Sequence, residues 1–172
     1  MRNLVMYRNP VVEKKIDDYL LKKVPDYYEK PWAEKKAIYE NLVRACKSCA
    51  LKFDTGYGSI PNIVNKDSFA VFIGRNPCKG EAQVNAIVSE DSRQGQLFKK
   101  YLLTLGLGQS EISVLNMACC HGKGNRPPTQ EEINKCIGFR KLEWDLIGDK
   151  FKIIFAMGND ALVFVNRFFY LK

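Results

Sequence analysis

Apolar residues follow two different spacings along this chain. Short runs rich in valine, isoleucine and phenylalanine alternate with longer stretches whose apolar residues recur every three or four positions. The short runs predict buried strands, and the longer stretches predict helices. The expected strands are residues 68–74, 111–117 and 151–158, and the expected helices are residues 94–105, residues 130–147 and a segment that begins at residue 159. This strand–helix alternation predicts an α/β fold with a parallel sheet and right-handed crossovers.

Two of these helices carry detailed signals. The first is expected to bury the residues spaced four apart, which are Leu97, Tyr101 and Leu105, and Gly106 is expected to end it. The second begins with a capping-box pattern formed by Thr129 and Glu132. Its expected buried stripe consists of Cys136, Phe139, Leu142 and Leu146.

The N-terminal part of the chain has a helical pattern without strands. Residues 10–23 predict one amphipathic helix. A second is expected to run from near Pro31 to Cys46, with Ile38, Leu42 and Ala45 on one face. We therefore expect a helical extension over residues 1–40 and one α/β domain over residues 41–172, with a loop at residues 50–66.

Charge and hydropathy narrow the possible functions. The 172 residues carry a formal net charge of +8, which favours a polyanionic partner such as DNA. No apolar run approaches the roughly 20 residues that a membrane span needs. The N-terminus lacks the apolar core of a signal peptide, so we expect a cytoplasmic protein without a membrane partner.

The six cysteines indicate a metal site. In a reducing compartment, cysteines at fixed spacing favour metal or cluster binding over disulfides. Cys46 and Cys49 form a C-x2-C pair, and Cys120 and Cys136 form a C-x15-C pair. Four thiolates can hold an iron–sulfur cluster or a structural zinc, and the long separation between the pairs favours the cluster. Cys119 is expected to point away from Cys120.

The order of motifs resembles a known family. A C-x2-C pair is followed by a strand ending in Gly-x-x-Pro, a strand ending in Asn, a Cys, the segment Gly-Asn-Arg-x-Pro-Thr-x-Glu-Glu and a last Cys. Over roughly residues 42–165 this pattern resembles the iron–sulfur, or family-4, branch of the uracil-DNA glycosylase superfamily. The resemblance implies a three-layer α/β/α sandwich around a parallel sheet of four strands, of which three are visible here. It also implies a structural 4Fe–4S cluster; its ligands would be Cys46, Cys49, Cys120 and Cys136.

The same resemblance assigns roles in catalysis. The implied activity is hydrolysis of the N-glycosidic bond of uracil, or of a related damaged or modified pyrimidine, in DNA. Asn76 stands in the third place of the first motif, as in the mismatch-specific and single-strand-selective branches of the superfamily, where that Asn positions the attacking water. Asn116 would read the uracil edge, since an amide presents both a donor and an acceptor. The base pocket would be lined by Gly74, Arg75, Pro77 and Asn116. Expected contacts to DNA phosphates are Lys79, Lys123, Asn125 and Arg126. The single histidine, His121, is expected beside the cluster or on a phosphate.

The chain departs from the family pattern in three places. Arg75 replaces a Glu of the first motif, the stretch AIVSEDSRQG lacks the aromatic residue that stacks on uracil, and no His-Pro-Ser segment follows the last strand. These departures leave three expectations open. The protein is a minimal glycosylase for single-stranded or modified DNA, or a catalytically inactive DNA-binding or protein-scaffolding subunit, or a protein partner supplies the missing C-terminal segment.

Overall fold

The computed structural model describes residues 5, 6, 22 and 24–170, and its centre is a parallel three-stranded sheet. The strands are β2 (Ala70–Gly74), β3 (Ile112–Asn116) and β4 (Ile153–Ala156), in the order β3-β2-β4. All three expected strands are therefore confirmed, and each is shorter than its apolar run, β4 by the most. The helix expected over residues 10–23 falls largely outside the described residues.

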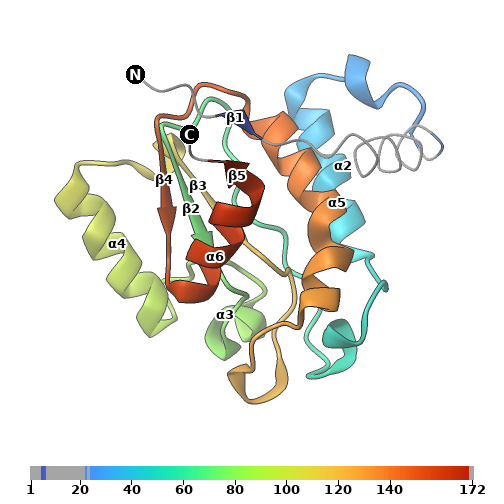
Figure 1. Cartoon of the computed structure of the whole chain (residues 1–172), viewed down its shortest axis with the longest axis vertical. Helices are drawn as coiled ribbons and strands as arrows, with labels where there is room; N and C mark the ends of the chain where they lie inside the picture. The colour runs from blue at the N-terminus through green and yellow to red at the C-terminus, as the bar shows by residue number, and fades with distance from the viewer. Residues whose placement is uncertain (1–4, 7–21, 23, 171–172) are drawn as a thin grey trace.

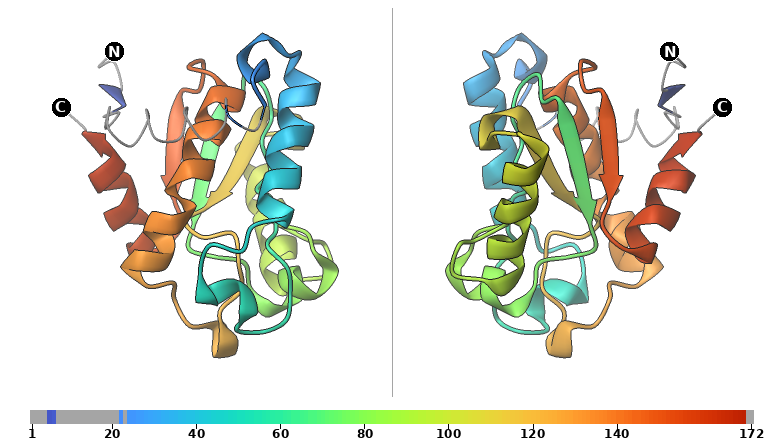
Figure 2. Two further views of the ribbon diagram at one scale, coloured as in Figure 1. Left: turned by 90° about the vertical axis from the view of Figure 1, so that its right-hand side faces the viewer. Right: turned by 90° about the vertical axis from the view of Figure 1, so that its left-hand side faces the viewer.

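Helices cover both faces of this sheet (Figure 1). On one face lies α4 (Arg93–Leu105), and on the other lie α2 (Trp32–Arg44), α5 (Gln130–Ile147) and α6 (Asn159–Phe168). Side chains alternate along each strand, so Phe72 packs with the α4 layer while Val71 and Ile73 pack with the other. The expected three-layer α/β/α sandwich is confirmed, and Figure 2 shows the sheet from the side of α5 in its left view and from the side of α4 in its right view.

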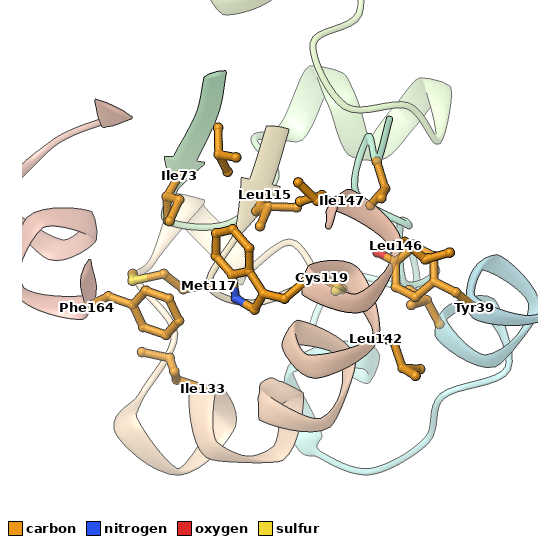
Figure 3. Close-up of a cluster of buried hydrophobic side chains, with 14 of the residues drawn as sticks. Tyr39, Ile73, Leu115, Met117, Cys119, Ile133, Leu142, Leu146, Ile147 and Phe164 are labelled. Atoms are coloured by element: carbon orange, nitrogen blue, oxygen red, sulfur yellow. The ribbon is translucent and has the colours of Figure 1, made fainter. Parts of the chain in front are cut away.

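The larger half of the core lies between the sheet and α5. Figure 3 shows Leu115 of β3 beside Ile147 of α5, and Phe164 of α6 between Met117 and Ile133. The capping box that opens α5 is present, because Thr129 Oγ1 accepts from the Glu132 backbone N–H at 3.2 Å. The predicted stripe is confirmed at its cysteine and two leucines, which are buried, while the phenylalanine between them is partly buried.

The predicted buried face of α4 is wrong. Leu97, Tyr101 and Leu105 are 48%, 56% and 51% exposed, whereas Phe98 and Leu102 are buried. Two apolar rows with the same spacing run along this helix, and tertiary contacts select the second one. Phe98 packs edge-on against Phe72 at 4.9 Å between ring centroids, which fixes the rotation of the helix.

The face predicted for α2 is also displaced by one position. Tyr39 and Val43 are buried, Ile38 and Leu42 are partly buried beside them, and Ala45 is exposed. The helix packs against α5 and ends at Arg44, so Cys46 follows it directly. The expected boundary between residues 40 and 41 falls within this helix, and the division into two domains stays a prediction.

Some elements were not predicted. Strands β1 (Val5–Met6) and β5 (Phe169–Tyr170) pair antiparallel, and α3 (Lys79–Val84) is a short helix after β2. The expected loop at residues 50–66 begins with a short 3-10 helix (Ala50–Phe53). Its residues 59–64 are largely buried, and Ile63 forms an antiparallel bridge with Val114 of β3. Within the described part of the chain, no helix has the length and apolar character needed to cross a bilayer.

Candidate functional site

The first motif and Asn116 meet at the carboxyl ends of two neighbouring strands. Gly74, the last residue of β2, is in register with Asn116, the last residue of β3. The backbone continues this pairing, because the Met117 N–H donates to Gly74 O at 2.9 Å and the Ala118 N–H donates to Arg75 O at 3.2 Å. Ligand sites in open α/β sheets gather at this edge. The two segments that the sequence predicted to form one site therefore lie side by side.

Asn116 presents a buried amide without a protein partner. The residue is 6% exposed, and its side chain makes no hydrogen bond to any residue that the structure describes. A Cβ atom added to Gly74 would lie 2.6 Å from Asn116 Oδ1. Glycine at position 74 therefore provides the space that the Asn116 amide occupies.

Asn76 and Arg75 connect the loops around this amide. Asn76 Oδ1 accepts from Arg75 Nε at 3.1 Å, and Asn76 Nδ2 donates to Cys120 O at 3.4 Å. Arg75 Nη2 donates to Asn125 O at 2.9 Å, and Nη1 lies 3.7 Å from a carboxylate oxygen of Asp160. Arg75 therefore joins the first motif to the loop before α5 and to the start of α6.

His121 forms a hydrogen bond with the backbone of the first motif. It is 4% exposed, and its Nδ1 lies 3.0 Å from Pro77 O. A carbonyl oxygen only accepts, so Nδ1 carries the proton and donates. The expected contact between His121 and a DNA phosphate is incompatible with this burial. Its location next to Cys120 agrees with the expected cluster neighbour.

The four predicted cluster cysteines come from three segments of the chain. Cys46 follows α2, Cys49 precedes a short 3-10 helix, Cys120 lies beyond β3, and Cys136 is in α5. Cys120 and Cys136 are buried in one small cluster with Leu51, and Cys49 packs against it. All six cysteines of the chain are free thiols.

These thiols also influence one another electrostatically. Burial raises the pKa of the Cys120 thiol to about 12, and the neighbouring Cys136, Cys49 and Cys46 act in the same direction. Cys136 accepts a hydrogen bond from Cys119, which lowers the pKa of Cys136 to about 6. Cys119 belongs to the main core and Cys120 to the small cluster, as expected for neighbours that point apart.

The cysteine side chains lie near one another but are not arranged as metal ligands. Across residues 5–6, 22 and 24–170, no group of three or more His, Cys, Asp or Glu side chains is arranged to hold a metal ion. The chemistry of the donor set nevertheless fits a group bound by four thiolates, because free thiols from both predicted pairs meet around the same cluster.

A family model of the uracil DNA glycosylase superfamily matches residues 61–171. The chain belongs to the uracil-DNA glycosylase superfamily. It is 29% identical over 136 residues to the type-4 uracil-DNA glycosylase of Archaeoglobus fulgidus, covering 76% of this chain and 63% of that relative. It is 28% identical over 131 residues to the type-4 uracil-DNA glycosylase of Thermotoga maritima, covering 74% of this chain and 64% of that relative. The resemblance in motifs is thereby confirmed, and the chain spans less than two thirds of the length of both relatives.

The residues expected to contact DNA divide into two groups within this superfamily member. Lys79, at the start of α3, and Lys123 and Asn125, in the segment before α5, are exposed beside the first motif. Arg126 is engaged inside the protein instead: Nε and Nη2 bind Asp54 at 2.9 and 2.6 Å, while Nη1 and Nη2 bind the carboxylate of Glu132 at 2.9 and 2.8 Å. Nη1 also donates to Pro127 O, so all five donors have partners. Arg126 fixes the loop that carries Lys123 and Asn125.

Replacing Glu132 with glutamine should lower the free energy of unfolding by about 1–3 kcal/mol, since Arg126 would lose a buried charged partner. The hydrogen bonds from Arg126 lower the pKa of Glu132 to about 2. A carboxyl group with a lowered folded-state pKa stabilises the fold above its unfolded-state pKa and loses this contribution as the pH falls towards about 2. Urea unfolding from pH 7 to pH 2 should therefore show a smaller acid-side loss in the variant.

Glu131 supplies a matched control on the same turn. Its side chain is 81% exposed and lies 3.7 Å from Lys135. Exposed pairs of this kind contribute little, so Glu131→Gln should leave stability within about 0.5 kcal/mol. Equal losses in the two variants would contradict the role assigned to the Arg126–Glu132 pair.

A buried polar network beneath the site was not predicted from the sequence. Arg140 Nη2 donates to Glu143 Oε1 at 2.6 Å and lies 3.2 Å from Cys119 Sγ, and both charged residues are almost fully buried. Burial raises the pKa of Glu143 to about 7. A signal was available, since the two residues occupy positions four and seven after Cys136 on the core face of the helix. The pattern of apolar residues alone did not reveal it.

Proposed function

We propose that the protein is a DNA glycosylase that hydrolyses the N-glycosidic bond of uracil, or of a related damaged or modified pyrimidine, in DNA. The observation that carries this proposal is the Asn116 amide, which is buried at the strand ends without a partner among the described residues. An amide offers a donor and an acceptor side by side, as the imide edge of uracil requires. A base flipped out of the stack would satisfy both. Such a substrate would place the protein inside the cell.

Asn76 would orient the attacking water. Its amide is neutral and cannot act as a strong base. Cleavage of the bond would therefore depend on the stability of the departing uracil anion and of the oxocarbenium-like sugar. Backbone N–H groups in the turn between Gly74 and Gly80 would stabilise the anion. To hold water, Asn76 would give up its bond to Cys120 O, which at 3.4 Å is the longer of its two hydrogen bonds.

The proposal is tested by assaying excision from a uracil-containing single strand with the wild-type protein and with Asn76→Ala. Excision that disappears in the variant supports the proposed catalytic role. Excision that persists unchanged in the variant would remove Asn76 from the mechanism. Absence of excision by the metal-loaded wild-type protein, together with salt-sensitive DNA binding, would contradict the proposed activity.

A specific observation favours a second candidate, a catalytically inactive DNA-binding or protein-scaffolding module. Both ends of the Asn76 amide are hydrogen-bonded within the protein, to Arg75 and to Cys120. In a catalytically inactive protein these bonds would persist with DNA bound, and Asn76 would only stabilise the loop. The assay above separates the two candidates.

A structural 4Fe–4S cluster bound by Cys46, Cys49, Cys120 and Cys136 is part of the proposal, with zinc as the alternative. The support is that Cys120 and Cys136 share one small buried cluster, that Cys49 packs against it, and that Cys46 acts electrostatically on Cys120. When bound, such a group would cross-link the segment after α2, the loop after β3 and α5, and would thereby fix the loop that faces DNA. Its chemistry would be structural, and the catalytic steps assigned above use only the protein's asparagines and backbone.

Gly74→Ala should disable the site without disturbing the rest of the fold. The new Cβ would lie 2.6 Å from Asn116 Oδ1 and would displace the amide. We expect excision to fall by about 10- to 100-fold, and overpacking to lower stability by about 1–3 kcal/mol. Gly58→Ala is the control, because a Cβ there meets nothing within 4 Å. Unchanged excision in Gly74→Ala would contradict the placement of the Asn116 amide.

Lys79 and Lys123 are proposed to contact DNA phosphates, together with Asn125. Each lysine-to-alanine substitution should weaken DNA binding uniformly across sequences and reduce the slope of log affinity against log salt concentration by about one. Lys150→Ala is the control, because this lysine precedes β4 at the opposite end of the sheet, where it pairs with Asp67. Fluorescence anisotropy at several salt concentrations measures the slopes, and identical slopes in all three variants would contradict the proposed surface.

A further inference from the structure

The side chain of Asn62 hydrogen-bonds to both backbone groups of Asn116, its N–H and its carbonyl oxygen. The Asn116 N–H donates to Asn62 Oδ1 at 3.1 Å, and Asn62 Nδ2 lies 3.5 Å from Asn116 O. Asn62 is 3% exposed and belongs to the segment that runs through the interior before β2. Because the contact is to the backbone, the Asn116 side chain stays available for a ligand while its Cα is fixed.

Asn62 is itself held by groups from two helices. Its backbone N–H donates to Tyr39 Oη at 3.0 Å, and its Nδ2 donates to Glu143 Oε1 at 2.9 Å. Tyr39 O–H donates to the same carboxylate oxygen at 2.5 Å. Tyr39 is in α2 and Glu143 is in α5, so the side chain of Asn62 is fixed by the helical layer that covers this face of the sheet.

The carboxylate that anchors this arrangement is in turn fixed by Arg140, at 2.6 Å. Buried ion pairs often contribute no more stability than apolar residues of similar volume. They do impose a defined geometry, since each displaced partner leaves an uncompensated charge. The series of hydrogen bonds from Arg140 through Glu143 to Asn62 therefore leads to the backbone of Asn116, the residue that carries the proposed base-reading amide.

We propose that Asn62 is a positioning residue, which acts through the backbone of Asn116 to hold the base-reading amide in place, with Tyr39 and Glu143 fixing Asn62. The consequence for catalysis rests on the proposed function. A displacement of about 1 Å in a reacting or reading group can lower a rate about 100-fold, so this support is expected to act on kcat.

The chain contains a matched control three residues away. Asn65 lies in the same segment and also binds β3, but at its beginning: Nδ2 donates to Gln109 O at 2.8 Å and to Ile112 O at 2.7 Å. Its backbone N–H donates to Ser113 Oγ at 2.9 Å. Substitution of Asn62 or Asn65 thus removes the same side chain and comparable contacts, at opposite ends of one strand.

The experiment compares Asn62→Ala with Asn65→Ala in excision kinetics and in urea unfolding. We expect Asn62→Ala to lower kcat by about 10- to 100-fold with little change in the Kd for a uracil-containing single strand. Asn65→Ala should lose comparable stability and retain nearly wild-type kcat. Equal effects on kcat in the two variants would overturn the proposal and leave Asn62 a purely structural residue.

Amide hydrogen exchange followed by NMR supplies a readout that does not depend on activity. In Asn62→Ala the Asn116 amide should exchange faster, while the Met117 amide, which donates to Gly74 O at 2.9 Å, should keep its protection. If the wild-type protein excises no base, the proposed function fails, and unchanged exchange at Asn116 would overturn the positioning as well. If Asn62→Ala does not fold, Tyr39→Phe takes its place, with a smaller change expected in the same direction and no change at Asn116 overturning the proposal.

Discussion

Replacing Asn116 with alanine is expected to abolish base excision and to leave nonspecific DNA affinity nearly unchanged. The amide would make its two hydrogen bonds with the base edge as the glycosidic bond breaks, and loss of one such donor lowers kcat by about 100- to 1,000-fold. DNA affinity depends mainly on phosphate contacts, and these are proposed for other residues, Lys79 and Lys123 among them. Single-turnover excision and anisotropy binding, measured on the same uracil-containing strand, check both parts.

The fold should survive this substitution, since Asn62 binds the backbone of Asn116 and not its side chain. Asn116→Asp is the matched variant, because it keeps the size and an acceptor oxygen and replaces the N–H donor with a second, ionised oxygen. Excision should be lost here too if the donor is needed to pair with a carbonyl of the base. Parallel loss of excision and DNA affinity in the alanine variant would show that Asn116 is structural.

Much of the fold was predictable because its signals are local. Each strand of the sheet is a continuous apolar run, as is typical of strands buried on both faces. The capping box at Thr129 and the glycine at position 106 mark helix ends through contacts within a few residues. Glycine at 106 adopts φ of 67°, which closes α4 where the sequence predicted.

The errors arise where distant contacts decide between equivalent local patterns. Helix α4 carries two apolar rows, and the predicted row of Leu97, Tyr101 and Leu105 is the exposed one. Phe72 of β2 selects Phe98 instead, and no property of the α4 sequence alone contains that information. Asn62 does lie outside helices and strands as expected, but its role was missed for a similar reason, since its partners lie 23, 54 and 81 positions away in the chain.

The candidate site shows both what could be predicted from the sequence and what could not. Asn116 and Gly74 were assigned to one pocket from the family resemblance, and the parallel strands bring both residues to one edge of the sheet. Arg126 was predicted to contact phosphate from its position in a basic loop, yet its guanidinium is engaged by Asp54 and Glu132. Charge in a loop predicts a surface, whereas the partner of each charge depends on the packed structure.

Replacing Cys136 with serine is expected to prevent binding of the proposed cluster or zinc and to lower stability more than any surface substitution. Cys136 is buried beside Cys120, and a group bound by four thiolates would couple α5 to two distant segments. We expect iron and sulfide to be lost from the purified protein, together with its visible absorbance. A loss of about 3 kcal/mol or more would lower Tm by roughly 6–12 °C for a chain of this size.

Cys78→Ser is the control for this substitution, since Cys78 lies outside the cysteine cluster and caps α3, where serine serves equally well. It should retain metal content and Tm. Zinc in place of iron in the wild-type protein, lost in Cys136→Ser and kept in Cys78→Ser, would identify the site as a structural zinc. Metal content unaffected by Cys136→Ser would contradict both forms of the proposal, because removing one of four ligands from such a closed site leaves an open coordination position and a weaker hold on every segment it joins.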